Sequence, residues 1–142
     1  MYLPNRALFS LVLLAGFQCM AVEPALEKLN YGAVVLSGVV VERTEYGPPN
    51  FENDGLCKKV KIRCIKLKKP VQVIGNKDDR FNSEDIDNIG VVQIIEPSGK
   101  NLRFAIGKKA KIKGVLEQAM TGHHYTKAIL SVKDLSDVEI EK

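Results

Sequence analysis

Regular alternation of apolar and polar residues predicts β-strands in the second half of the chain. Two segments, 109–116 and 126–133, alternate between lysine or polar residues and apolar residues, which is typical of half-buried strands. The expected inward-facing sets are Ala110, Ile112 and Leu116 in the first segment and Ala128, Leu130 and Val132 in the second. From residue 22 onward the chain has 25 Val and Ile against 9 Leu, and this bias toward β-branched side chains also favours strands.

The longest predicted strand runs from Tyr31 to Arg43. It is apolar on both parities, so both of its faces should be covered over part of its length. Gly38 lies inside the run, where a missing side chain permits a bulge or a sharp bend. A long, bent strand shared by two layers is what a small closed barrel requires.

Further strands are expected at 57–69, 71–74 and 91–95. Apolar residues in the first of these change parity between Cys64 and Ile65, which predicts a β-bulge. Pro70 should interrupt the hydrogen-bonded ladder because it has no N–H. In the polar stretch 76–89, Asn82 with Asp85 three positions on predicts a short helical turn.

This order of elements predicts an all-β fold with at most a short helix. It suits a five- to six-stranded Greek-key barrel like the oligonucleotide/oligosaccharide-binding (OB) fold, and the alternative is an irregular antiparallel β-roll. We expect one domain over 31–133, preceded by a lead-in over 22–30. The acidic residues 134–142 should form a flexible tail that frays.

The first 21 residues differ from the rest and predict export. Arg6 is followed by an uncharged, largely apolar run of 11 residues, too short to span a membrane but typical of a signal peptide. Small residues at Cys19 and Ala21 predict cleavage at that point, so the mature chain would start near Val22. Lipid attachment at Cys19 is the alternative, although Gln18 is not the small residue expected before it. We therefore predict a periplasmic or secreted protein without a transmembrane segment after cleavage.

Export places the remaining cysteines, Cys57 and Cys64, in an oxidising compartment where thiols can pair. On one extended strand their Cα atoms would lie roughly 23 Å apart, far beyond disulfide reach. A bridge therefore requires Cys57 to belong to the preceding loop and to fold back. We keep the pair as a disulfide candidate and assign both thiols a structural role.

Two loops carry an unusual share of the aromatic and histidine residues. In an OB-like barrel, 44–56 joins the first two strands and 118–125 the last two, and these loops flank the usual binding face. They contain the candidate binding residues Tyr46, Asn50, Phe51, His123, His124 and Tyr125. One interpretation is that these side chains only close the barrel end. The other is a recognition edge for an envelope protein or ligand, of which an inhibitor or immunity protein is a specific form.

The chain resembles the bacterial exported proteins grouped as domain of unknown function 4431. The resemblance spans about 31 to 133, and its most specific part is Thr121-Gly122-His123-His124-Tyr125-Thr126. Other matching segments are Tyr46-Gly47-Pro48-Pro49-Asn50-Phe51 with Glu52, Pro70-Val71-Gln72-Val73, Val92-Gln93-Ile94, Gly107-Lys108 and Gly114-Val115-Leu116. It implies an exported small β domain and no established activity. Some relatives have a third histidine where Tyr125 stands, so this departure weakens a histidine-rich metal site here.

Metal binding through His123 and His124 is the alternative function. Adjacent residues on an extended chain point to opposite sides, and zinc needs a third and usually a fourth ligand. Glu45, Glu52 or Asp54 could supply one only if the two loops meet. The competing interpretation is that one imidazole holds the loop through backbone hydrogen bonds. We therefore predict no metal site and no cofactor.

The sequence also predicts a protein without catalytic activity. It contains no Gly-x-Ser-x-Gly elbow, no His-Glu-x-x-His motif and no phosphate-binding glycine loop. A pair formed by Cys64 and His123 would need a free thiol in an oxidising compartment.

The chain carries a net charge of +4, much of it in lysine-rich stretches at 58–69 and 108–113. Lysines alternating with apolar residues are ordinarily the solvated face of a strand. We do not expect nucleic acid as a partner, because the sequence has no aromatic residue between Phe51 and Phe81 on which bases could stack. An acidic partner stays an option: an anionic glycan, a lipid headgroup surface or an acidic protein.

Overall fold

The computed structural model describes residues 25–142 and consists of β-strands with two single 3₁₀ turns. The signal peptide predicted over 1–21 and the alternative lipid site at Cys19 lie outside the described residues. The elements are β1 (Glu27–Asn30), β2 (Gly32–Tyr46), β3 (Lys59–Ile74), β4 (Ile86–Ile95), η1 (Arg103–Ala105), β5 (Lys109–Gln118), β6 (Ala128–Ser131), η2 (Leu135–Asp137) and β7 (Val138–Ile140). The prediction of an all-β chain is confirmed.

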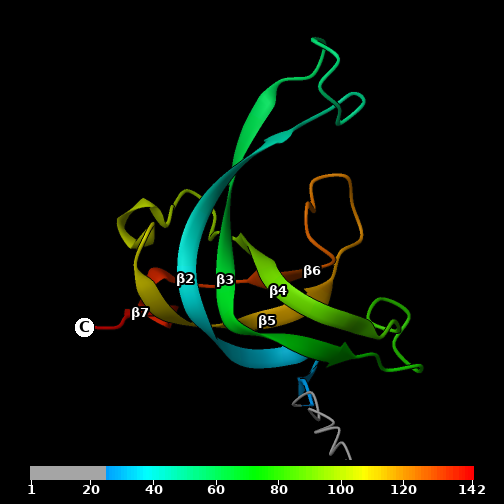
Figure 1. Ribbon diagram of the computed structural model, residues 1–142, viewed down its shortest axis with the longest axis vertical. Coiled ribbons are helices and arrows are strands. Elements are labelled where there is room, and N and C mark those ends of the chain that lie inside the picture. The colour runs from blue at the N-terminus through cyan, green and yellow to red at the C-terminus, as the bar shows by residue number, and fades with distance from the viewer. Residues whose placement is uncertain (1–24) are drawn as a thin grey trace, which may run out of the picture.

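Five of the strands form a ring of hydrogen-bonded pairs (Figure 1). β2 pairs with β3, β3 with β4, β4 with β6, β6 with β5, and β5 again with β2. The β4–β6 pair is parallel and the other four are antiparallel. The OB-like arrangement predicted from the sequence is therefore confirmed, although the whole sheet has seven strands rather than five or six.

The interior of the ring is filled mainly by branched aliphatic side chains. Val40, Ile65, Ile112 and Leu130 are fully buried. Because the paired strands β2 and β3 bend around this core, their backbones approach closely at Gly38 and Lys66. A Cβ atom on Gly38 would lie 2.2 Å from the carbonyl oxygen of Lys66, so glycine is required at this point.

Of the two irregularities predicted in β3, the bulge at Cys64 and Ile65 is wrong, whereas the interrupted ladder at Pro70 is confirmed. The register of β2 with β3 is unbroken from Gly38 to Tyr46, so no bulge accompanies the change of parity at Cys64 and Ile65. Both residues are buried because the strand is covered on two sides there. The pairing of β3 with β4 instead shifts between Lys66 and Val71, around Pro70, while β3 itself continues through the proline.

The predicted helical turn at Asn82 and Asp85 is also wrong. Asn82 instead closes a turn with Asp79, and its side-chain oxygen accepts a hydrogen bond from the Gln118 backbone N–H at 3.0 Å. The single-turn helices form elsewhere, at η1 and η2.

The chain segments on either side of the predicted domain are ordered. Within the predicted lead-in, β1 pairs in parallel with β3. The tail predicted to fray instead forms η2, with Asp134 and Asp137 in a capping box, and then β7, which pairs with β5. Val138 is 9% exposed and belongs to the core, so apolar burial holds this acidic segment in place.

β2 and β3 extend beyond the ring as a two-stranded arm. β2 leaves β5 after Val39 but stays paired with β3 as far as Tyr46. We call 43–46 together with 59–62 the hairpin arm. It carries the loop 47–58 (first loop) at the top of Figure 1, while the loop 119–127 (second loop) joins β5 to β6 below it.

Candidate functional site

The first and second loops contact each other through an aromatic side chain. The ring of Phe51 lies 6.3 Å from that of Tyr125 between centroids, at an interplanar angle of 58°. Gly122 packs beneath Phe51 so closely that a Cβ atom there would lie 2.8 Å from the ring carbon Cζ. The loops predicted to flank one edge are therefore neighbours, with bounds of 47–58 and 119–127 instead of 44–56 and 118–125.

Asp54 organises the first loop. Its carboxylate accepts hydrogen bonds from the Asn50 side-chain amide at 2.7 Å, from the Leu56 N–H at 2.9 Å and from the Cys57 N–H at 3.2 Å. These donors stabilise the charged form, the Asn50 amide most, and lower the pKa of Asp54 to about 2. Asn50 therefore acts within the loop instead of pointing freely into solvent.

His124 organises the turn of the second loop. Its ring nitrogen Nδ1 accepts hydrogen bonds from the Met120 N–H at 2.9 Å and the Thr121 N–H at 3.4 Å. Its backbone N–H donates to the carbonyl of Thr121 at 3.0 Å. This arrangement matches the interpretation in which one imidazole holds the loop.

Gln93, on β4, ties the second loop to the barrel. Its side chain is 5% exposed. Its amide nitrogen donates to the carbonyl of His123 at 3.0 Å, and its oxygen accepts from the Tyr125 N–H at 2.6 Å. The backbone N–H of Gln93 also donates to the Thr126 hydroxyl at 2.8 Å. The sequence analysis did not identify Gln93 as a site residue. The feature that could have indicated it is its position as the one polar residue in an apolar strand, between Val92 and Ile94.

Tyr125 lies at the centre of the contact between the loops. Its hydroxyl is buried and has no hydrogen-bond partner within residues 25–142. Gly47 and Val60 lie beside this hydroxyl. A Cβ atom on Gly47 would lie 3.2 Å from the Val60 side chain and 3.9 Å from the Tyr125 hydroxyl, so little free space remains there. A buried hydroxyl without a partner is unusual and leaves one donor unused at this contact.

Two predicted site residues stand apart from this contact. Tyr46 pairs with Lys59, whose ammonium lies 5.8 Å from the Tyr46 ring centroid. Because side chains alternate along a strand, these two lie on the opposite face of the hairpin arm from Val60. His123 is exposed and contributes its backbone carbonyl, not its ring, to the bond with Gln93.

The face that carries Tyr46 also holds an ionic cluster that the sequence analysis did not identify. Arg63, 9% exposed, lies 3.6 Å from carboxylate oxygens of both Glu42 and Glu96. Glu42 accepts a hydrogen bond from Lys61, which with the nearby cations lowers its pKa. Glu96 also accepts from the Leu102 N–H at 2.7 Å. The cluster neutralises the buried guanidinium and closes this end of the barrel.

Both cysteines are free thiols in the structure, so the disulfide candidate is not formed. Cys64 lies inside the regular part of β3, five strand positions or roughly 16 Å beyond Lys59, and Cys57 precedes that strand. The Cys57 sulfur instead accepts a hydrogen bond from the Asn50 N–H at 3.3 Å. Burial raises the pKa of the Cys64 thiol to about 11, which makes it a poor nucleophile.

The metal hypothesis gains no third ligand. Within residues 25–142 no group of three or more His, Cys, Asp or Glu side chains lies close enough to hold an ion. His124 already uses Nδ1 for the loop.

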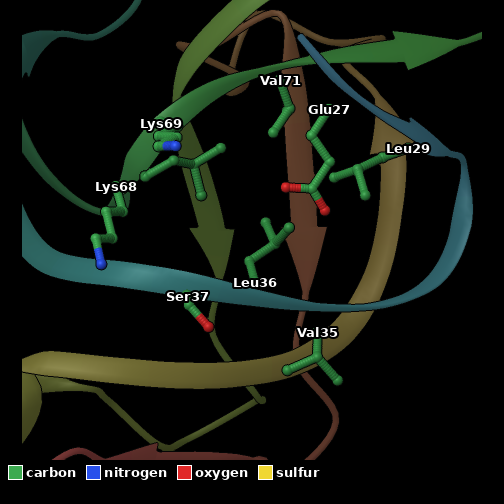
Figure 2. Close-up of a pocket in the computed structure, with 9 residues that line it drawn as sticks. Glu27, Leu29, Val35, Leu36, Ser37, Lys68, Lys69 and Val71 are labelled. Carbon is green, nitrogen blue, oxygen red and sulfur yellow. The ribbon is translucent and has the colours of Figure 1, made fainter. Parts of the chain in front are cut away.

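A cleft of different character lies away from the loops, between β1, β2 and β3. Figure 2 shows Leu36 pointing toward Leu29 and Val71, with the Glu27 carboxylate between Leu36 and Val71 and with Lys68 and Lys69 on the β3 side. None of the predicted site residues lines this cleft.

Comparisons with known proteins give one match. Residues 91–139 match the family model described as Domain of unknown function (DUF4431), a stretch that runs from within β4 through the second loop to β7. No curated protein and no solved structure matches the chain. The described part of the chain also contains no helix that is both long and apolar enough to cross a membrane. The resemblance stated from the residues is therefore confirmed over residues 91–139, where the chain is similar to the family of the domain of unknown function DUF4431.

Proposed function

We propose that this protein is an exported, non-enzymatic binding module whose first and second loops together form the recognition surface for an envelope protein or ligand. The observation that carries the proposal is Phe51, a large apolar side chain that is 40% exposed although it is packed against Tyr125 and Gly122. Aromatic residues, phenylalanine among them, are enriched in protein interfaces relative to the rest of the surface. Inhibition of a hydrolase or toxin is a specific form of this function.

The loops are ordered before any partner binds, which favours recognition. Phe51 has φ of +59°, an uncommon conformation for a residue with a side chain. Asp54 fixes the first loop, and Gln93 and His124 fix the second. A partner therefore would not have to order these loops on binding, and that entropic cost is a main limit on affinity.

The absence of catalysis is supported by how the reactive residues are used. The Cys64 thiol is buried with a raised pKa, and the Nδ1 of His124 already accepts backbone hydrogen bonds. Among the described residues these two therefore offer no activated nucleophile with a free base.

Export is supported by the signal-peptide pattern of residues 1–21. Cleavage near Val22 would fall before β1, which begins at Glu27, and would leave every described strand intact. Mass spectrometry of the protein from the periplasmic fraction tests this, because a chain that still carries residues 1–21 would contradict it.

The recognition surface is tested by affinity capture from an envelope extract. Phe51→Ala should lose a partner that the wild-type protein retains, because it removes the exposed ring without disturbing the barrel. Phe104→Ala is the matched control, since Phe104 lies on η1 and is 44% exposed. A partner retained equally by wild type and Phe51→Ala, or lost equally from both variants, would contradict the assignment of the site.

A further inference from the structure

A second surface, on the outside of β3, β2 and β5, is rich in lysines. Cross-strand pairing places Val39 between Lys66 and Lys109, and Ser37 opposite Lys111. Val35 lies opposite Lys113. Lys68, two positions beyond Lys66, borders the same surface together with Ser37 and Val39. We call Lys66, Lys68, Lys109, Lys111 and Lys113 the lysine face.

The strand geometry separates this face from the core. Figure 2 shows Val35 and Ser37 pointing to the side of β2 opposite to Leu36. Val35 is 60% exposed, while Leu36 is 4% exposed. All five lysines are exposed. The surface therefore presents a row of ammonium groups with an exposed aliphatic side chain, Val35, at one end.

The lysine face keeps an excess of positive charge. None of its five lysines is among the ion pairs formed within residues 25–142. The acidic residues along its edge are Glu139, paired with Lys111, and Glu141, whose backbone N–H bonds to the Lys109 carbonyl. Five lysines and these two carboxylates give the lysine face with its edge a net charge of +3.

The residue types indicate which partner fits. Protein hot spots are enriched in Trp, Tyr and Arg, and single-stranded nucleic acid needs aromatic side chains for stacking. The strand residues that form this surface include neither aromatic residues nor arginine. Attraction to an anionic lipid surface depends instead on the number of nearby lysines and needs no fixed geometry. An exposed aliphatic residue such as Val35 adds apolar contact at the headgroup boundary.

We propose that the lysine face docks the protein reversibly on an anionic phospholipid bilayer. The complementarity is that of several ammonium groups with a surface of phosphate headgroups, and the exposed Val35 lies at one end of the lysine face. The first loop follows Tyr46 at the far end of β2, so a protein docked in this way keeps the first loop accessible. The inference does not depend on the function proposed for the loops.

Cosedimentation with vesicles tests the proposal. The probes are vesicles of equal parts phosphatidylglycerol and phosphatidylcholine, and vesicles of phosphatidylcholine alone. The wild-type protein should bind the first and not the second, with binding weakened by salt. Changing Lys68, Lys111 and Lys113 together to Gln should weaken binding about 100-fold, because each lysine near such a surface contributes about fivefold.

Two further variants separate the lysine face from total charge. Changing Lys58, Lys127 and Lys133 to Gln removes the same charge from exposed positions elsewhere and should change binding only a few-fold. Changing Lys68, Lys111 and Lys113 to Arg keeps the charge and should retain binding. Equal losses in the two Gln variants, loss of binding in the Arg variant, or wild-type binding to both vesicles alike would overturn the proposal. Wild-type protein that binds soluble polyglutamate but neither vesicle would also overturn it, in favour of an acidic protein.

Discussion

Replacing Gln93 with leucine should detach the second loop from the barrel. The substitution keeps a side chain of similar volume at a position that is 5% exposed, so it leaves little cavity. It removes the donor to the His123 carbonyl and the acceptor for the Tyr125 N–H. Both backbone groups then lack a partner unless the loop moves out into water.

The expected loss of stability follows from these two hydrogen bonds. Each contributes about 1 kcal/mol net, and leaving a buried partner unsatisfied costs more, so the free energy of unfolding should fall by at least about 2 kcal/mol. For a domain of this size, that change corresponds to a melting temperature lower by about 8 °C. Gln72→Leu is the matched control, because Gln72 makes one exposed hydrogen bond to Asp87 and should cost no more than about 0.5 kcal/mol.

Thermal melts measured by circular dichroism give the global effect, and amide hydrogen exchange at Tyr125 gives the local one. In the wild-type protein the Tyr125 N–H is bonded at 2.6 Å and should exchange slowly. In Gln93→Leu it should exchange much faster, while amides inside β5 keep their order of protection. Gln93→Leu that melts within 1 °C of wild type, or equal protection of Tyr125 in both proteins, would refute the reasoning.

Three other predictions test the loops separately. Gly122→Ala should push Phe51 away from the second loop, because the new Cβ atom would lie 2.8 Å from the Phe51 ring carbon Cζ. The NMR signal of the Phe51–Tyr125 contact should then disappear while the melting temperature changes little, and an intact contact would contradict the packing. The pKa of Asp54 is lowered from 3.8 to about 2, so the carboxylate stabilises the first loop fully above pH 3.8 and this stabilisation is lost as pH falls through about 2. The NMR shift of the Asn50 side-chain amide should therefore change with a midpoint near pH 2, and a midpoint near 3.8 would contradict this. Zinc should not raise the melting temperature of dialysed protein, since His124 Nδ1 is engaged by Met120; a gain that His123→Ala removes would restore the metal hypothesis.

The sequence predicted the fold class because most strands bury one face, and alternation reports that directly. It failed where a strand is covered on two sides. Cys64 and Ile65 are both buried in a regular ladder, and a parity change there resembles a bulge although none exists. It also failed at β7, where acidic neighbours of Val138 suggested a frayed tail, because pairing with β5 is a long-range contact that local composition does not encode.

The candidate site was only partly predictable for the same reason. Aromatic residues in loops indicated Phe51 and Tyr125, which do meet. Tyr46 was included by its position in the sequence, but the last residues of β2 alternate in direction and its ring lies on the opposite face of the hairpin arm. Gln93 was missed because a polar residue in a strand is expected to face water, whereas here the second loop covers it.

The two proposed surfaces are joined by β2 and can be tested independently. Val39 lies among the lysines and Tyr46 begins the turn into the first loop, seven residues or roughly 23 Å further along the strand. Sites more than about 10 Å apart that share no partner have additive effects. Loss of vesicle binding in the Lys68, Lys111 and Lys113 variant should therefore leave capture through Phe51 unchanged, and Phe51→Ala should leave vesicle binding unchanged. If either change weakens both activities while the melt stays that of the wild type, the barrel has one extended binding surface rather than two.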